Sequence, residues 1–136
     1  MIDVAYIALG SNLGDRYAYL AEGRAALATL PRTSIIGESS IEETDPIGPT
    51  AQGRFLNQMV AVETELAPRE LLPHLMTIEA NAGRIRDVRW GPRTLDLDIV
   101  CFAKQTANEP NLLVPHPELP NRPFWQRELA ELGGPA

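Results

Sequence analysis

A chain of 136 residues, 44% of them hydrophobic, is long enough to bury one core and too short to build two, so we expect a single domain over residues 1–136. The formal net charge of −6 argues against non-specific binding to nucleic acid, which needs a basic surface. No apolar run reaches the roughly 18 residues of a membrane span, and no pattern marks a secretion signal, so we expect a cytoplasmic protein that binds no membrane. The single cysteine, Cys101, lies in an apolar run, which is typical of a buried and inert thiol.

The first part of the chain contains the patterns of a strand, a helix and a second strand. Alternating residues predict a strand from Val4 to Leu9, which ends at a Gly-Ser-Asn turn. Helical spacing of apolar residues predicts a helix over residues 15–30. Residues 33–43 are β-branched and alternating, which indicates a second strand. Residues 44–49 contain two prolines around a glycine and must form a loop.

The rest of the chain adds a strand, a helix and a last central strand. Residues 55–66 alternate again, as a strand does. Residues 68–83 carry the apolar stripe of a helix, in which Pro73 predicts a kink or a later start. Residues 94–102 form the last central strand. A coil rich in Asn and Pro then leads to a short terminal helix near residues 118–132.

The resulting order of elements is strand, helix, strand, strand, helix, strand, which is the α+β ferredoxin-like pattern. It predicts a mainly antiparallel sheet with helices on one face and the active site on the other, free face. RNA-recognition modules share this order. The net charge and the lack of interleaved aromatic residues on the last strand argue against that alternative.

The strongest chemical signal is the segment Arg89–Ile99, R-W-G-P-R-T-L-D-L-D-I. In a strand its alternate leucines would face the core, so Asp96 and Asp98 would project together from the opposite face, with Cα atoms roughly 6.5 Å apart. Neighbouring carboxylates suit Mg²⁺, which also takes phosphate oxygens. Arginines that could complete a clamp for a triphosphate lie nearby: Arg84, Arg86, Arg89 and Arg93. A bare pair of acids is more often a solvated strand face, but these neighbours favour a metal site.

Two weaker signals lie outside this segment. Phe55 and Asn57 share one strand face, where a ring could stack on a flat heterocycle and a carboxamide could bind its edge. His116 and Arg122 could donate to phosphate, and Phe124 could supply a second ring. Taken alone, the first pair is more often a packing contact. The second group fits a proline-shaped turn with a structural histidine equally well.

Together these segments resemble the 6-hydroxymethyl-7,8-dihydropterin pyrophosphokinase family. The resemblance covers nearly the whole chain from Val4 to Phe124, and Arg89 to Asp98 is specific enough to name the family. Its segments are Ala8–Asp15, Thr44–Pro49, Phe55–Asn57, Glu79 with Gly83–Arg86, Arg89–Asp98, and Val114–Pro117 with Arg122 and Phe124. It implies transfer of diphosphate from ATP to 6-hydroxymethyl-7,8-dihydropterin in folate biosynthesis, which gives AMP and the pterin diphosphate.

The resemblance also implies a role for individual side chains. Asp96 and Asp98 would hold two Mg²⁺ ions that bridge the ATP phosphates and the pterin hydroxyl, and Arg84 and Arg93 would neutralise the transferring diphosphate. The nucleotide side would also be lined by Glu79, Arg86, Trp90, Ile99, Leu113, His116 and Arg122, several of them through backbone or apolar contact. The pterin side would be formed by the rings of Phe55 and Phe124, the amide of Asn57, and backbone at Thr44, Pro46 and Ile47.

Two features depart from the family pattern. Asn111 stands where members often carry an arginine that faces phosphate. The C-terminus from Trp125 to Ala136 is shorter than the family pattern, which leaves open what covers the last part of the core, and a partner chain could supply that cover. The alternative function is therefore a shortened homologue that binds pterin or nucleotide without turnover.

Overall fold

The computed structural model describes residues 1–45, 53–83 and 94–135. The elements in chain order are β1 (Asp3–Ser11), α1 (Arg16–Leu27), β2 (Thr33–Glu38), β3 (Glu42–Thr44), β4 (Phe55–Thr64), α2 (Pro68–Asn81), β5 (Asp96–Phe102), β6 (Ala107–Glu109), β7 (Leu112–Val114), a short 3-10 helix η1 (Leu119–Asn121), and α3 (Pro123–Glu131). None of the helices in these ranges is long and apolar enough to cross a membrane.

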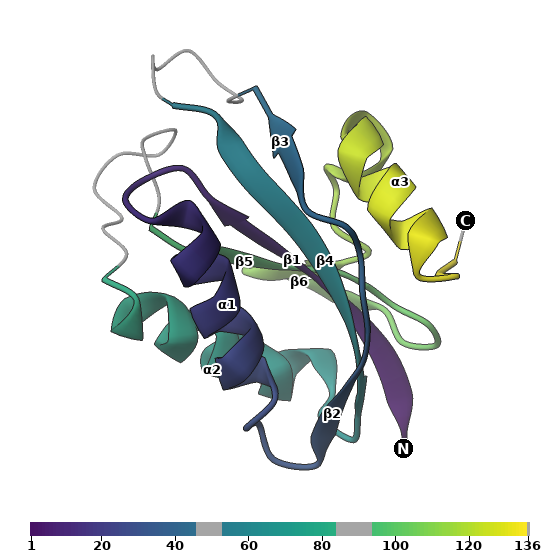
Figure 1. The fold of residues 1–136 in the computed structure, drawn as a ribbon. Coiled ribbons are helices and arrows are strands. Elements are labelled where there is room, and N and C mark those ends of the chain that lie inside the picture. The colour runs from purple at the N-terminus through teal and green to yellow at the C-terminus, as the bar shows by residue number, and fades with distance from the viewer. Residues whose placement is uncertain (46–52, 84–93, 136) are drawn as a thin grey trace.

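The main sheet is antiparallel and has the strand order β2-β4-β1-β5, with β3 also paired to β4 (Figure 1). The two central strands, β1 and β4, are buried over most of their length. A strand covered on both faces needs apolar residues in both alternating positions, which explains the nearly continuous apolar run of β1. The α+β class predicted from the order of elements is confirmed.

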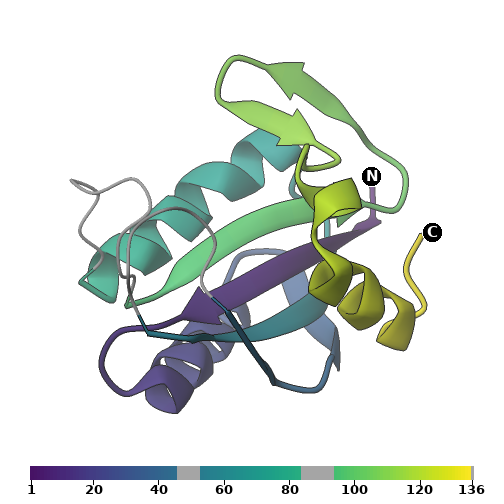
Figure 2. The same cartoon turned by 90° about the horizontal axis from the view of Figure 1, so that it is seen from above.

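Helices α1 and α2 cover one face of this sheet (Figure 1, Figure 2). The side chain of Asp15 caps α1 by accepting a hydrogen bond of 3.1 Å from the backbone N–H of Ala18. Helix α2 begins at Pro68, so the later start predicted from Pro73 is wrong. Pro73 lies inside this helix and has no N–H to donate to the carbonyl of Arg69, which belongs to the first turn.

Helix α3 packs on the opposite face of the sheet, away from α1 and α2 (Figure 2). Trp125 and Leu129 form its apolar contact, and the sheet residues in this second core cluster are Tyr6, Ala8, Met59, Ala61, Val100 and Cys101. The face expected to be free is therefore only partly free. The chain's own α3 supplies cover for this part of the core, and Cys101 is buried as predicted.

Two local predictions need correction. The strand predicted over residues 33–43 is divided into β2 and β3, because Ser39 turns out of regular pairing while its backbone N–H and its Oγ both bond to the backbone of Met59. The coil predicted after β5 contains the hairpin of β6 and β7, whose turn is Pro110-Asn111. Its three-residue strands are too short to show alternation in the sequence.

Candidate functional site

The predicted site residues line up across the sheet face that α3 partly covers. Gly10 of β1 pairs with Asn57 of β4 on one side and with Asp96 of β5 on the other. Ala8, two residues earlier in β1, pairs with Asp98. Residues that are directly opposite in antiparallel strands share a face, and so do residues two apart in one strand. The amide of Asn57 and both carboxylates therefore share one face, with the side-chain-free Gly10 between them.

The structure separates the acids of β5 from its apolar residues as the alternation predicts. Leu95, Leu97 and Ile99 belong to the core cluster under α1 and α2. Asp96 and Asp98 are half-buried, and the Asp98 side chain keeps 29% of its surface exposed. The acid pair can therefore contact a ligand on the α3 side without crossing the core.

His116 extends this acidic site towards α3. Its Nε2 lies 3.8 Å from Oδ1 of Asp98, and its Nδ1 accepts a hydrogen bond of 3.0 Å from the backbone N–H of Glu118. Burial lowers the pKa of His116, and Arg122 lowers it further, whereas Glu118 and Asp96 act in the opposite direction. A neutral imidazole whose Nδ1 is an acceptor carries its proton on Nε2. The ring therefore presents an N–H towards Asp98.

The donor set suits Mg²⁺ better than a metal that needs a full protein cage. The described part of the chain contains no group of three or more His, Cys, Asp or Glu residues that could hold a metal ion. Mg²⁺ is commonly held by one or two carboxylates together with water and substrate phosphates. Asp96 and Asp98 match that pattern.

Beside the acids, β3 and β4 place a ring and an amide on the same sheet face. Asn57 is 8% exposed, and its Nδ2 donates a hydrogen bond of 2.5 Å to Oγ1 of Thr44. Phe55 pairs with Thr44 in the same register. A Cβ at Gly10 would lie 3.5 Å from the Phe55 ring and 3.6 Å from Oδ1 of Asn57. Glycine at this position therefore keeps space open in front of the ring and the amide oxygen.

Trp125, which was not among the predicted site residues, connects several that were. Its ring makes T-shaped contacts with the rings of His116 and Phe124. The ring centroids are 4.9 Å apart for His116 and 6.3 Å apart for Phe124. The guanidinium carbon of Arg122 lies 4.3 Å from its ring centroid. A signal existed in the sequence, since Trp125 follows Phe124 and precedes Leu129 by one helical turn, which places it on a core-facing stripe.

Three of the other predicted nucleotide residues lie in the described parts of the chain. Glu79 is 3% exposed, and its Oε2 accepts a hydrogen bond of 2.7 Å from the backbone N–H of Leu97, between the two acids. The Ile99 side chain lies in the core on the helix side, so only its backbone could reach a ligand on the site face. Leu113 is exposed on β7, in the hairpin. The remaining predicted residues lie outside the described residues: Pro46, Ile47, Arg84, Arg86, Arg89, Trp90 and Arg93.

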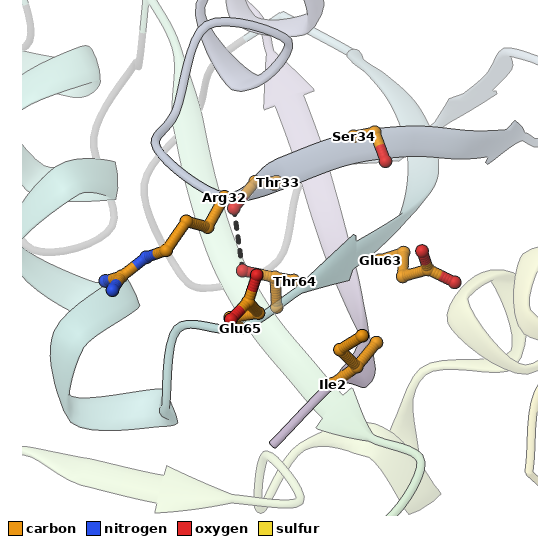
Figure 3. Close-up of a pocket in the computed structure, with 7 residues that line it drawn as sticks. All are labelled: Ile2, Arg32, Thr33, Ser34, Glu63, Thr64 and Glu65. Carbon is orange, nitrogen blue, oxygen red and sulfur yellow. Dashed lines mark hydrogen bonds between the residues drawn. The ribbon is translucent and has the colours of Figure 1, made fainter.

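A separate shallow pocket lies at the far end of the sheet (Figure 3). It is formed around Thr33 and Thr64, whose hydroxyl groups are 2.7 Å apart, at the opposite end of β4 from Phe55. None of the predicted site residues within the described ranges lines it: the described lining is Ile2, Arg32, Thr33, Ser34, Glu63, Thr64 and Glu65.

An α+β sheet that carries a carboxylate pair on the same face as a ring and an amide has the side chains that metal-assisted group transfer needs. The sequence matches the family model of 7,8-dihydro-6-hydroxymethylpterin-pyrophosphokinase over residues 6–134, and the chain belongs to this family. It is 47% identical over 132 residues to the 2-amino-4-hydroxy-6-hydroxymethyldihydropteridine pyrophosphokinase of Bacillus subtilis. The aligned region covers 97% of this chain and 79% of the relative. The protein of the same name from Pseudomonas aeruginosa is 45% identical over 132 residues, covering 97% of this chain and 82% of the relative.

Proposed function

We propose that the protein transfers diphosphate from ATP to 6-hydroxymethyl-7,8-dihydropterin in folate biosynthesis and releases AMP. Membership of the pyrophosphokinase family over residues 6–134 supports this activity. The structural observation that carries it is the carboxylate pair Asp96 and Asp98, which shares a sheet face with Asn57. The transferring phosphates and the accepting pterin would meet between them.

In this proposal Asp96 and Asp98 would hold two Mg²⁺ ions together with the ATP phosphates. When bound, Mg²⁺ neutralises phosphate charge and stabilises the entering and leaving oxygens of the transfer. The role of the protein is to fix the geometry of the reacting groups, because positioning and charge neutralisation account for most of the catalysis of phosphoryl-type transfer. The hydrogen bond from the Leu97 N–H to Glu79 restrains β5 between the two acids. Glu79 would thus act from the core side of the strand.

On the pterin side, Phe55 and Phe124 would enclose the flat ring system. Asn57 would bind its edge through Oδ1, because the hydrogen bond to Thr44 fixes the orientation of the amide. The amide edge of a pterin carries N–H donors, which an amide oxygen can accept. Backbone at Thr44, Pro46 and Ile47 would complete the pocket.

On the nucleotide side, the Nε2–H of His116 and the guanidinium of Arg122 would donate to phosphate oxygens. Their positions against Trp125 support this role, since both approach the same ring. As the family resemblance implies, Arg84 and Arg93 would neutralise the transferring diphosphate, and further nucleotide contacts would come from Arg86, Trp90, Ile99 and Leu113.

The alternative of a shortened homologue without turnover is not favoured. It depended on missing cover over the core, and Trp125 and Leu129 of α3 provide cover there. Incubation with ATP, Mg²⁺ and the hydroxymethyl dihydropterin, followed by separation of the nucleotides, tests the proposal. We expect AMP in equal amount to the pterin diphosphate, and neither product from Asp98→Asn. ADP as the sole nucleotide product would refute diphosphate transfer, and bound pterin without any product would support the alternative.

A further inference from the structure

Helix α3 is held to strand β3 by a cluster of charged side chains that the proposed site does not use. Arg127 places Nε and Nη2 each 3.0 Å from Oε1 of Glu42. Glu131 accepts hydrogen bonds of 2.9 Å from the backbone N–H of Ser40 and 2.8 Å from its hydroxyl. We call Ser40, Glu42, Arg127, Glu128 and Glu131 the α3 clasp.

Glu128 is the buried member of the clasp. Its side chain is 0% exposed, and neither of its carboxylate oxygens accepts a hydrogen bond from a donor in the described parts of the chain. Oε2 of Glu42 is also buried without a donor. A hydrogen bond between the side chains of Glu42 and Glu128 is one of the causes that raise the pKa of Glu128. Ionised carboxylates only accept hydrogen bonds, so this hydrogen bond requires that one of the two holds a proton and donates it.

The surroundings of Glu128 place that proton on Glu128. Among the described residues, the charged groups that face it are Glu42 on β3 and Glu131 and Arg127 on α3. The single cation among these, Arg127, already pairs with Glu42. Burial, followed by the proximity of Glu42, raises the pKa of Glu128 to about 9. A bound metal ion would be the other way to satisfy the oxygens, but the described residues offer no cluster of three metal-binding side chains.

The carboxyl pair links the two elements that would carry the walls of the proposed pterin pocket. Phe124 and Glu128 are four residues apart in α3, so they lie on neighbouring positions of one helix face. Glu42 is paired directly with Asn57 across β3 and β4. Asn57 in turn bonds to Thr44. The contact between Glu42 and Glu128 therefore joins the helix that carries one ring to the strands that carry the other ring and the amide.

We propose that Glu42 and Glu128 share one proton and act as positioning residues, which keep Phe124 in place opposite Phe55 and Asn57, with the proposed pterin site between them. Loss of the shared proton places two negative charges together in a buried site, which drives α3 away from β3. Pterin binding then weakens. Nucleotide binding changes less, because the acids Asp96 and Asp98 lie on β5, on the other side of β1 from β4. This inference rests on the proposed function, because it assumes that the pocket takes a pterin.

The test compares wild type, Glu128→Gln and a matched control, Glu22→Gln, which makes the same change at an exposed position of α1. Glutamine has the shape of the protonated acid and can donate to Glu42, but it does not ionise. Calorimetric titration gives the dissociation constants of the hydroxymethyl dihydropterin and of Mg-ATP from about pH 7 to about pH 10. Carbon-13 NMR of the Glu128 carboxyl group follows its proton without ligand.

We expect the wild type and Glu22→Gln to lose pterin affinity by about tenfold more than Glu128→Gln over this range, with Mg-ATP affinity alike in all three proteins. The NMR signal of Glu128 should titrate near pH 9. Identical pH dependence of pterin binding in wild type and Glu128→Gln would overturn the proposal, and so would equal losses for both ligands. If Glu128→Gln does not fold, Glu42→Gln removes the repulsion by changing the other carboxyl group. It should reduce the pH dependence of pterin affinity in the same way. Absence of AMP formation with pH-dependent pterin binding would refute the proposed function and leave the positioning role standing, whereas a wild type that binds no pterin at about pH 7 would refute both.

Discussion

Replacing Glu128 by glutamine should stabilise the folded protein, and the gain should grow as the pH rises. Burial and the neighbouring Glu42 raise the pKa of Glu128 from 4.5 to about 9 in the folded chain. The folded state therefore binds this proton more tightly than the unfolded state. The stabilisation by the proton is fully present below the unfolded pKa, near 4.5, and is lost progressively up to about pH 9.

The size of this effect follows from proton linkage. Between the two pKa values, folding takes up nearly one proton, so the free energy of unfolding falls by about 1.4 kcal/mol for each pH unit. From pH 6 to pH 8 the loss amounts to about 3 kcal/mol, which is large against the stability of a typical domain. Glutamine does not titrate, so the Glu128→Gln variant should not show this loss.

Urea unfolding of the wild type, Glu128→Gln and Glu22→Gln at several values between about pH 5 and pH 9 measures the difference. Glu22→Gln also removes one glutamate charge from the unfolded chain. It therefore corrects for the effect of that charge on the stability of the unfolded state. The stability advantage of Glu128→Gln over the wild type should be smallest near pH 5 and increase by about 3 kcal/mol from pH 6 to pH 8. A difference between the two proteins that stays constant with pH would refute the protonated state of Glu128.

Three further experiments test the site and the core. Asp96→Asn and Asp98→Asn should each abolish AMP formation and the rise in unfolding midpoint caused by Mg-ATP. The stability of the ligand-free protein should stay within about 1 kcal/mol of the wild type. A lower midpoint without ligand, together with an undiminished rise with Mg-ATP, would contradict the metal site. Glu79→Ala leaves the N–H of Leu97 without its buried acceptor and should lower the free energy of unfolding by about 2–4 kcal/mol in urea titrations, whereas unchanged stability would show that water replaces the acceptor. Burial raises the pKa of Cys101 to about 11, so a thiol reagent should modify it only in the unfolded protein, and rapid modification of the native protein would contradict this burial.

Most of the fold could be predicted from local patterns. The alternation in β1 and β4, the Asp15 cap of α1 and the apolar stripe of α2 each depend on residues close together in the sequence. The division of residues 33–43 into two strands could not be predicted, because Ser39 is fixed by Met59, which comes much later in the chain. The position of α3 on the second sheet face also depends on distant partners.

The candidate site shows the same division. Alternation was enough to place Asp96 and Asp98 on one face, because a strand has only two faces. It could not assign Glu42 and Glu128 to a common site, since nothing in the local sequence of β3 or α3 requires them to meet. It also could not distinguish a Glu79 that contacts a ligand from a Glu79 that bonds to the backbone of β5.

An irregularity in β5 connects the core under α3 to the acidic site. Tyr6 pairs with Cys101 and Ile7 pairs with Ile99, so Val100 is an extra residue in β5 without its own partner in β1. Such bulges turn the side chains around them and often lie next to active sites. Here the bulge turns both Val100 and Cys101 towards α3 while Ile99 stays on the helix side. The carbonyl of Val100 accepts a hydrogen bond of 2.8 Å from the backbone N–H of His116, which brings the imidazole beside Asp98. The continuous apolar run from Ile99 to Phe102 conceals this bulge in the sequence. A residue that contacts no ligand in the proposed mechanism thus sets the distance between the histidine and the acid.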